Sequence, residues 1–495
     1  MTERSDHTSE GVEPDENRGI GVDKWVAESD DRRERHSGFR GRIEHLWEIL
    51  PPAGKLALLT PAIVVPFLPI SNGNLYNYGV FILIYALLAL GLNVVVGWAG
   101  LLDLGYVAFF GFGAYIYAFL SGTHSAAGHT YTHHWGAERT IPIAVLVCAL
   151  LGVFLGSSSR RLLGDYLAIV TLFFGQAFVV FTNAANPAGI TNGSNGLANV
   201  DPLTFFGGRI VIDTTRGYYW FLLGTVGLLL VVLYALSESR TGRAWKASRE
   251  DPLSAELMGM PVNRLKIMAF SFGAGIAGLA GSIFAAVQTG AFPQNFGTTV
   301  LIIIYAVVIL GGSGSLTGMI VGAVVIVASN QALDSTSPPN LPRILFYAAV
   351  IAAVYFTLKS WPQRLAAFGG TALFGLLVHA IVGSVWSDGT AGEVTSGGFL
   401  DGAIKNWVLI PTDPSRLAVY GYLMLIVSVT VLVQLKGWWR IGVLVPTLYL
   451  TAFVWENLMI QQPSVTRQVL LGLLLIGVMT IRPQGLFGQA KVEVV

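Results

Sequence analysis

The sequence predicts an all-α protein of the polytopic integral membrane class, a helical bundle of about 11–14 transmembrane or re-entrant helices. Hydrophobic residues make up 53% of its 495 positions and charged residues only 12%, whereas a soluble domain has roughly 25% charged residues. The mean hydropathy is +0.62. Apolar segments of membrane-spanning length also recur along the chain. Together these observations favour a membrane-spanning bundle.

Charge and cysteine content exclude other classes of function. A net charge of +1 provides no electrostatic basis for binding nucleic acid. Cys148 is the only cysteine, so neither an intrachain disulfide nor a cysteine metal cluster can form. Redox chemistry and metal binding are therefore not expected of this chain.

Residues 1–50 are predicted to be a disordered, charged cytoplasmic tail, because they carry many charges of both signs and few apolar residues. No signal-peptide pattern opens the chain, so the first apolar span is expected to remain as a helix. The candidate spans lie at 55–70, 78–98, 105–121, 141–157, 165–183, 218–237, 267–288, 298–312, 316–333, 343–358, 366–385, 417–434, 441–458 and 467–481.

Threading these spans alternately across a membrane places the clusters of Lys and Arg on one side. By the positive-inside rule that side is the cytoplasm. The loops on the opposite side are polar but have few Lys or Arg; they are 122–140, 184–217, 385–416 and 459–466. The prediction is a multi-pass protein of the cell inner membrane with both termini cytoplasmic.

The charged run at residues 239–260 interrupts this apolar pattern. It cannot span the membrane, because each Arg, Lys or Asp placed at its centre costs about 2.5–3.5 kcal/mol. Asp251 followed by Pro252 is a helix-start signal, and Gly259 is a stop signal. A separate two-turn helix is therefore expected over 252–258.

Leu253, Leu257 and Met258 are expected to share one face of this short helix, forming an apolar stripe within a charged surround. Such a stripe suits docking into a groove of a partner protein. The alternative is an ordinary solvated loop whose helix packs on its own membrane domain.

Several motifs have the residues and the order of a known family. They are GLNVVVGWAGLLDLGYVAFFGFGAYIYAFL (91–120), GDYLAIVTLFFGQ (164–176), TNGSNGL (191–197), SRTGRAWKASREDPLSAELMGMPVNRLKIMAFSFGAGIAGLAGSIFA (239–285), VVILGGSGSLTGMIVGAV (307–324) and RPQGLFG (482–488). In these motifs the chain resembles the branched-chain amino acid ABC transporter permeases of the LivM type. The resemblance covers about 85–333 and the end of the chain.

The resemblance implies that 252–259 is the coupling helix, which in ABC importers docks on the ATP-binding subunit. Ala255 and Gly259 keep the spacing of the importer loop, but Leu253 stands where many importers have Glu. Docking is therefore expected to depend on shape and apolar contact. The predicted coupling site comprises Asp251, Pro252, Leu253, Ala255, Leu257, Met258 and Gly259.

The resemblance also implies a domain order: a permease core at 51–345, accessory or inserted transmembrane helices at 346–465, and a terminal helix with a cytoplasmic end at 466–495. FYAAVIAAVYFTLKSWPQRLAAFG (346–369) is loosely echoed by QVLLGLLLIGVMTIRPQGLFG (468–488), as a repeat or by coincidence. The role of the 346–465 segment stays open.

The partners implied by the resemblance are two ATP-binding subunits, a second permease, an extracytoplasmic substrate-binding protein, an amino acid substrate and membrane lipid. ATP and magnesium would be held by the partner subunits, with no cofactor on this chain. Leu, Ile and Val are the expected substrates. Three alternatives stay open: a urea, short-amide or other amino acid importer, an ion-coupled carrier, and a channel-like or scaffold protein.

Two glycine-rich stretches have the look of nucleotide motifs, but neither fits one. No G-x-x-x-x-G-K-[ST] occurs, so the chain is not expected to hydrolyse ATP or to be an enzyme. GAGIAG (273–278) lies inside an apolar span, where small residues allow close helix packing. GGSGSLTG (311–318) predicts a tight turn between two helices, with or without backbone exposed to a cavity.

Polar residues near apolar segments are candidates for the substrate pathway. An intramembrane carboxylate is a functional candidate by default, but for Asp103 and Asp165 the favoured interpretation is that they are helix N-caps at the interface. TNGSNGL (191–197) is either a plain outer loop or a contact for the substrate or its binding protein. The candidate pathway residues are Asn93, Asp103, Thr191, Asn192, Ser194 and Asn195.

Ionisable residues are scarce where an ion-coupled carrier needs them, since none of Asp, Glu, Lys or Arg occurs from Ile267 to Gln331. Histidines gather instead in one outer segment, at positions 124, 129, 133 and 134. Without cysteines or a fixed helical spacing they predict a flexible histidine-bearing loop in place of a metal site.

Overall fold

The computed structural model describes part of the chain. The described ranges are 73–126, 129–158, 164–184, 191–332, 340–358, 360–392, 401–413, 415–435, 438–461, 463–481 and 485–488. The predicted tail at 1–50 and the first candidate span at 55–70 lie outside them.

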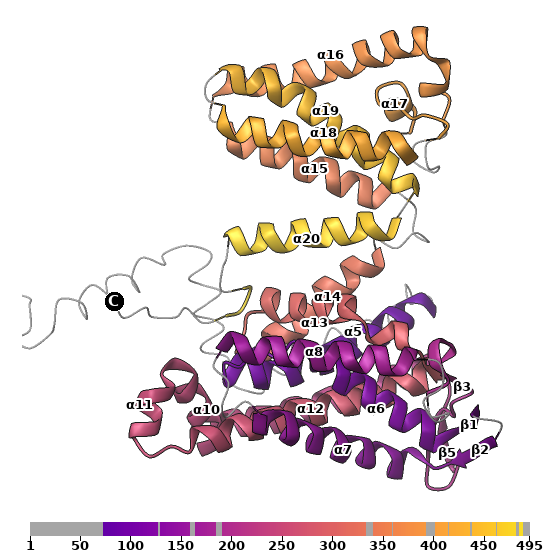
Figure 1. Cartoon of the computed structure of the whole chain (residues 1–495), viewed down its shortest axis with the longest axis vertical. Helices are drawn as coiled ribbons and strands as arrows, with labels where there is room; N and C mark the ends of the chain where they lie inside the picture. Colours follow the sequence, from indigo (N-terminus) through magenta and orange to yellow (C-terminus); the bar gives the residue numbers. More distant parts are fainter. Residues whose placement is uncertain are drawn as a thin grey trace, which may run out of the picture. The chain divides into compact units, whose positions relative to one another are not determined.

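The described part is helical, as the apolar segments predict (Figure 1). Its core helices are α5 (Gly73–Leu92), α6 (Tyr106–Leu120), α7 (Ala137–Ser158), α8 (Gly164–Asn183), α9 (Thr215–Glu238), α12 (Val262–Val287), α13 (Thr298–Gly311) and α14 (Leu316–Ala332). The later helices are α15 (Asn340–Thr357), α16 (Trp361–Val385), α17 (Asp401–Lys405), α18 (Ser415–Gln434), α19 (Trp438–Gln461) and α20 (Pro463–Ile481).

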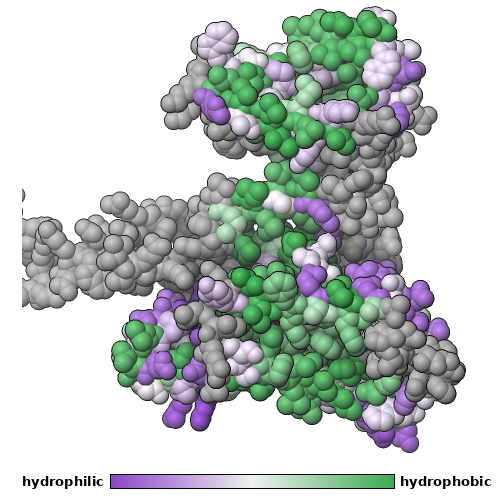
Figure 2. Space-filling model, in the orientation of Figure 1, coloured by the Kyte–Doolittle hydropathy of each residue, from purple (hydrophilic) through white to green (hydrophobic). Residues whose placement is uncertain are grey.

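Each candidate span inside the described ranges coincides with one of these α-helices, so the predicted fold class is confirmed. Seven of the described helices are long and apolar enough to cross a membrane, and three shorter apolar helices accompany them. Figure 2 shows apolar side chains over the middle of the core and polar ones toward its ends. This distribution is expected of helices whose middle sections face lipid.

Helix α12 is the centre of the core and packs against α5, α6 and α7. A Cβ atom added at Gly281 would lie 2.0 Å from the backbone oxygen of Phe110 in α6, and one added at Gly278 would lie 2.7 Å from the sulfur of Cys148 in α7. The small residues therefore bring three helices into close contact. The predicted packing role of the GAGIAG segment is confirmed.

Three two-stranded antiparallel sheets follow the ends of the core helices. They are β1 (Ser121–Ala126) with β2 (His129–His134), β3 (Leu197–Ala198) with β6 (Gly290–Ala291), and β4 (Leu203–Phe205) with β5 (Ile210–Ile212). Because β6 follows the end of α12 whereas the charged run precedes its start, the sheets and that run lie at opposite ends of the core (Figure 1).

The prediction of a flexible histidine-bearing loop is wrong, because the segment is the β1–β2 hairpin. The ring of His133 stacks on Phe119 with 5.9 Å between centroids. His134 Nδ1 lies 2.5 Å from the carboxylate of Asp201. Cross-strand pairing and these contacts order the segment. Among the described residues, no group of three His, Cys, Asp or Glu could hold a metal ion.

An ion cluster around the buried Arg343 joins three of the later helices, α15, α17 and α19. Arg343 of α15 bonds to Glu456 of α19 and to Asp401 of α17. Helix α15 crosses the domain boundary predicted between residues 345 and 346. The family-like part of the chain and the segment after it are thus connected through a shared helix and through this cluster.

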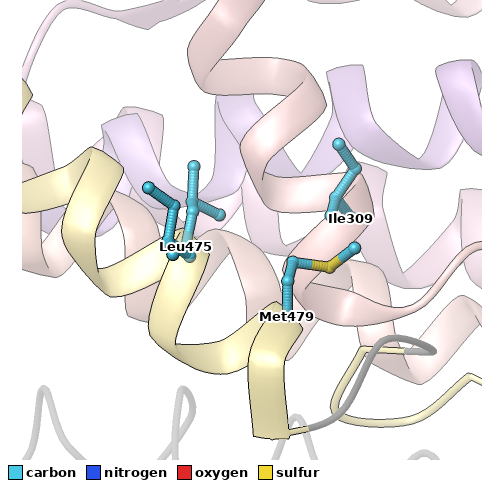
Figure 3. A pocket seen from close by; sticks show the side chains of 4 residues that line it. Ile309, Leu475 and Met479 are labelled. Atoms are coloured by element: carbon cyan, nitrogen blue, oxygen red, sulfur yellow. The ribbon is translucent and has the colours of Figure 1, made fainter. Parts of the chain in front are cut away.

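The end of the chain returns to the core. Helix α20 packs beside α13, and an open apolar hollow between them is lined by Ile309, Leu475, Ile476 and Met479 (Figure 3). Beyond α20, the backbone N–H of Leu486 donates to the carbonyl of Leu310 at 2.8 Å.

The two Pro-Gln turns that echo one another in the sequence lead to different structures. The first, from Trp361, begins helix α16, with its proline in the first turn. After the second, residues 485–488 run beside the end of α13 without forming a helix.

Candidate functional site

The charged run forms two helices, α10 (Arg240–Glu250) and α11 (Pro252–Leu257). The sequence interpretation missed α10, although a helix-start residue was present: the hydroxyl of Ser239 accepts from the N–H of Gly242 at 3.2 Å. Trp245, a lone large aromatic residue among charges, is fully buried on α10. It was the signal that one face of the run packs on the core.

Helix α11 is capped as the sequence predicts. Asp251 Oδ1 accepts from the N–H groups of Leu253 at 2.9 Å and Ser254 at 3.0 Å. The Ser254 hydroxyl donates to Asp251 Oδ2 at 2.5 Å. That hydroxyl first, and then the Ser254 N–H, hold the pKa of the Asp251 carboxyl below its ordinary value.

The end of α11 depends on Gly259, which has a φ of +82°. The N–H of Met260 donates back to the carbonyl of Ala255 at 3.0 Å, the closing bond of a glycine-terminated helix. The helix itself ends at Leu257, one residue before the predicted end, because Met258 is its C-cap. The predicted stop signal is confirmed.

Helix α11 presents an apolar stripe away from the core. Leu253, Leu257 and Met258 are 68%, 82% and 81% exposed, whereas Ala255 is 4% exposed. Helix α11 touches α10 and α12, so the short helix is held in place through its Ala255 side. The stripe therefore does not pack on the membrane domain of its own chain. Figures 1 and 2 show α11 at one end of the core, apolar among polar residues.

Helix α10 ties α11 to the interior of the core. The indole N–H of Trp245 donates to the carbonyl of Leu265 in α12 at 2.7 Å, and its ring stacks on Trp98 with 6.3 Å between centroids. Arg249, in the last turn of α10, donates from its guanidinium to the carbonyl oxygen of Gly97. The short helix thus follows an element with two anchors in the core.

Gly97 and Trp98 belong to a π-helical turn, η3 (Asn93–Trp98), which continues α5. Wide turns of this kind are frequent at functional sites. The Asn93 side-chain oxygen accepts from the N–H of Gly314 at 2.7 Å, and the Trp98 indole donates to the Gly314 carbonyl at 3.2 Å. The side chains of Asn93 and Trp98 therefore both form hydrogen bonds with Gly314, in the turn between α13 and α14.

The turn between α13 and α14 is the one predicted at 311–318. Gly312 and Gly314 have φ of +98° and +95°, a conformation that L side chains rarely adopt. A Cβ atom at Gly97 would lie 2.6 Å from the backbone nitrogen of Gly314. Glycine on both sides thus permits the close approach of η3 to this turn.

Asn93, in η3, and Asp103, before α6, are both fully buried. Asp103 Oδ1 accepts from the N–H of Gly105 at 2.9 Å, but Gly105 is itself the N-cap of α6 and no side chain caps that helix, so the N-cap interpretation of Asp103 is wrong. Its backbone carbonyl accepts from the hydroxyl of Tyr305 at 2.6 Å. Asn93 Nδ2 and Asp103 Oδ2 have no hydrogen-bond partner within the described residues. The side chain of Asp165 is not among those that the structure describes.

The other candidate pathway residues lie elsewhere, near the sheet of β3 and β6. Thr191 is buried, and Asn192 has a φ of +59° and donates to the carbonyl of Gly196 at 3.0 Å, which closes the loop on itself. Ser194 and Asn195 are exposed. The structure therefore does not bring these residues together with Asn93 and Asp103.

Comparison with known proteins agrees with this architecture. The family described as branched-chain amino acid transport system / permease component matches residues 74–354. The high-affinity branched-chain amino acid transport system permease proteins LivM of Escherichia coli (strain K12) and Salmonella typhimurium (strain LT2) are each 37% identical over 299 residues, 56% of this chain and 67% of each relative. No solved structure matches the chain.

A more distant relative is the high-affinity branched-chain amino acid transport system permease protein LivH of Salmonella typhimurium (strain LT2), 24% identical over 249 residues, which cover 49% of this chain and 79% of that protein. The match to the family begins in α5 and ends in α15, so it includes the π-helical turn, α10, α11 and the glycine turn. The chain therefore belongs to the family of branched-chain amino acid transport system permease components.

Proposed function

We propose that this chain imports Leu, Ile and Val across the inner membrane as the permease subunit of a transporter driven by ATP hydrolysis on partner subunits. The observation that carries the proposal is α11, a capped short helix held by the core with Leu253, Leu257 and Met258 exposed. Such a surface suits the groove of a partner protein. The relatives named LivM support the choice of substrate.

The proposed assembly has two ATP-binding subunits, a second permease and an extracytoplasmic binding protein. The relationship to LivH supports a pair of related permeases. ATP and magnesium would be held by the ATP-binding subunits. Both termini of this chain would lie in the cytoplasm, on the side of α11.

The central helices of the core lack charged side chains over a long range, which favours substrates with apolar side chains. From Ile267 to Gln331, a range that includes most of α12 and all of α13, no Asp, Glu, Lys or Arg occurs. Such a region offers no charged partner to the side chain of a substrate, which favours amino acids with aliphatic side chains over those with charged ones. Selection between substrates would then fall mainly to the binding protein.

Transport is tested by uptake of labelled leucine in cells with and without this gene. We expect uptake to be lost without the gene, restored by it, and competed by unlabelled isoleucine and valine. Competition by urea, short amides or other amino acids instead would replace the proposed substrate. Uptake that persists without a partner ATPase would contradict the ATP-driven mechanism.

The role of α11 is tested by Leu257→Asp, which places a charge in the centre of the apolar stripe. We expect transport and co-purification of the ATPase to be lost while the chain remains in the membrane. Glu256→Gln is the matched control, because Glu256 is also exposed on α11 but lies outside the stripe. Equal uptake in both variants would contradict the docking role.

Gly259 supplies a second test, in which shape alone changes. Its φ of +82° is unfavourable for a β-branched residue but accessible to Asn, and an added Cβ would meet no atom within 4 Å. Gly259→Val should therefore abolish transport and Gly259→Asn should retain most of it. Retained uptake in Gly259→Val would show that the shape of this helix end is dispensable.

A further inference from the structure

Three segments that are far apart in the sequence meet at one place beside α10. They are the π-helical turn η3, the turn between α13 and α14, and the end of the chain at 485–488. The N–H of Phe487 donates to the carbonyl of Gly311 at 3.0 Å, and a Cβ at Gly485 would lie 2.6 Å from Gly312. Hydrogen bonds and close glycine contacts therefore join the π-helical turn, the glycine turn and the terminal segment to one another.

Arg249 is the side chain that joins α10 to this meeting point. Its guanidinium donates to the Gly97 carbonyl, and its Nη1 lies 3.5 Å from the position of a Cβ on Gly314. Its aliphatic stem lies along Gly100, where an added Cβ would be 2.7 Å from Arg249 Cγ. Arg249 thus contacts the chain at Gly97, within η3, and at Gly100, just after it, and it lies beside the turn between α13 and α14.

Arg249 is also close to the partner-facing helix. It lies two residues before Asp251, whose carboxylate caps α11. The hydrogen bonds of the Asp251 carboxylate to the N–H groups of Leu253 and Ser254 fix the first turn of α11 to the residue that follows α10. Force applied to the stripe of α11 would therefore reach Arg249 over a very short length of backbone.

From this geometry we infer that Arg249 is a positioning residue of the transport cycle. It transmits displacement of α11 to η3, and through Asn93 and Trp98 to the glycine turn at Gly314. Trp245, with its hydrogen bond to α12 and its stack on Trp98, is the fixed point beside which Arg249 moves. This inference rests on the proposed function, because it requires α11 to be the element that the ATPase moves.

The route differs from transmission through α12 alone. Helix α12 begins at Val262, beyond Gly259, so it follows α11 in the chain. Arg249 precedes α11 and reaches α5 instead. One route leaves α11 at its C-terminal end, through α12, and the other leaves it at its N-terminal end, through Arg249. Substitution of Arg249 interrupts only the route at the N-terminal end.

The test compares Arg249→Ala, Arg249→Lys and Arg243→Ala in the complete transporter reconstituted with its ATPase. Arg243 is the matched control: it lies on the same helix, is exposed, and within the described part of the chain its side chain bonds only to a nearby group, the carbonyl of Glu238. We expect Arg249→Ala to assemble and to hydrolyse ATP, but to lower leucine uptake per ATP hydrolysed by about tenfold. Arg249→Lys should restore part of the ratio, and Arg243→Ala should leave it unchanged.

A second readout separates transmission from a merely structural role. Amide hydrogen exchange at 93–98 and 312–316 should change on nucleotide binding in the wild-type complex but not in Arg249→Ala, while exchange without nucleotide stays the same. If Arg249→Ala does not assemble, Arg249→Lys is compared with wild type in the same two measurements. A wild-type ratio and a wild-type exchange response in the variant would overturn the inference. Absence of ATP-driven leucine uptake in the wild-type complex would instead overturn the proposed function.

Discussion

Replacing Glu456 by Gln should destabilise the later helices strongly. Arg343 and Glu456 both have fully buried side chains, and they form two hydrogen bonds, of 3.2 and 3.0 Å. The hydroxyl of Tyr347 donates to the same carboxylate at 3.1 Å. In Glu456→Gln an amide N–H₂ group faces a donor, and the buried guanidinium loses its main counter-charge.

The expected cost is about 3–5 kcal/mol, the range found when one partner of a buried ion pair is removed. Asp401→Asn provides the scale: it removes the charge from a single 2.5 Å bond to Arg343, but the carboxylate is 25% exposed, so water replaces part of the loss. We expect about 1–2 kcal/mol for that variant. The double variant Arg343→Met, Glu456→Met should recover to within about 2 kcal/mol of wild type, because it leaves no fully buried charge unpaired and the Asp401 carboxylate, which loses Arg343, is 25% exposed.

Unfolding in mixed detergent micelles, titrated with sodium dodecyl sulfate and followed by tryptophan fluorescence, measures these differences. Trp455 is a local reporter, since it stacks on Phe346 with 3.8 Å between centroids beside the ion cluster. A free energy of unfolding for Glu456→Gln equal to that for Asp401→Asn would refute the reasoning. So would a double variant less stable than Glu456→Gln.

Further predictions concern the core and α11. Gly281→Ala should destabilise the core by about 1–3 kcal/mol, since its Cβ meets a backbone oxygen at 2.0 Å. A Cβ at Gly224 meets nothing within 4 Å, so Gly224→Ala should be neutral or stabilise by up to about 1 kcal/mol. Unfolding in detergent measures the sign of both changes. Cys148 is buried, so maleimide should label it at least about 100-fold more slowly in mild detergent than after unfolding, and fast labelling would contradict the helix contact. The hydrogen bonds of Asp251 lower the pKa of its carboxyl, so the cap stabilises α11 fully above the pH at which the unfolded carboxyl titrates, and this stabilisation is lost as the pH falls through the folded pKa. Ser254→Ala should raise the folded pKa of Asp251, as measured by ¹³C NMR. An unchanged titration would contradict this prediction.

What the sequence predicted well depends on local signals. Helix lengths follow from apolar runs, and the bounds of α11 follow from Asp251 and Gly259, because a cap and a stop act within one turn. Helix α10 was missed because its charges obscured the buried face marked by Trp245. The hairpin at 121–134 was missed because its strands are short and polar, with no apolar alternation to indicate them.

The contacts that carry the proposals join residues too far apart for any local pattern. Arg249 and Gly97 are 152 positions apart, and Asn93 and Gly314 are 221 apart. Glycine is needed at Gly314 because of its positive φ and at Gly97 because of the close approach of Gly314, and a sequence shows the glycines without the neighbours that require them. Motif order indicated the family, whereas only the fold shows that these motifs meet.

The ion cluster also bears on the segment that follows the region matched to the family. That match ends at residue 354, so Arg343 lies inside it, whereas both carboxylates that neutralise Arg343 lie beyond it, on α17 and α19. A guanidinium buried among apolar helices without a counter-ion costs several kcal/mol. Helix α15 therefore depends on the later segment for Asp401 and Glu456, the two carboxylates that neutralise its arginine, so a chain cut after residue 354 would leave the guanidinium of Arg343 without either of them.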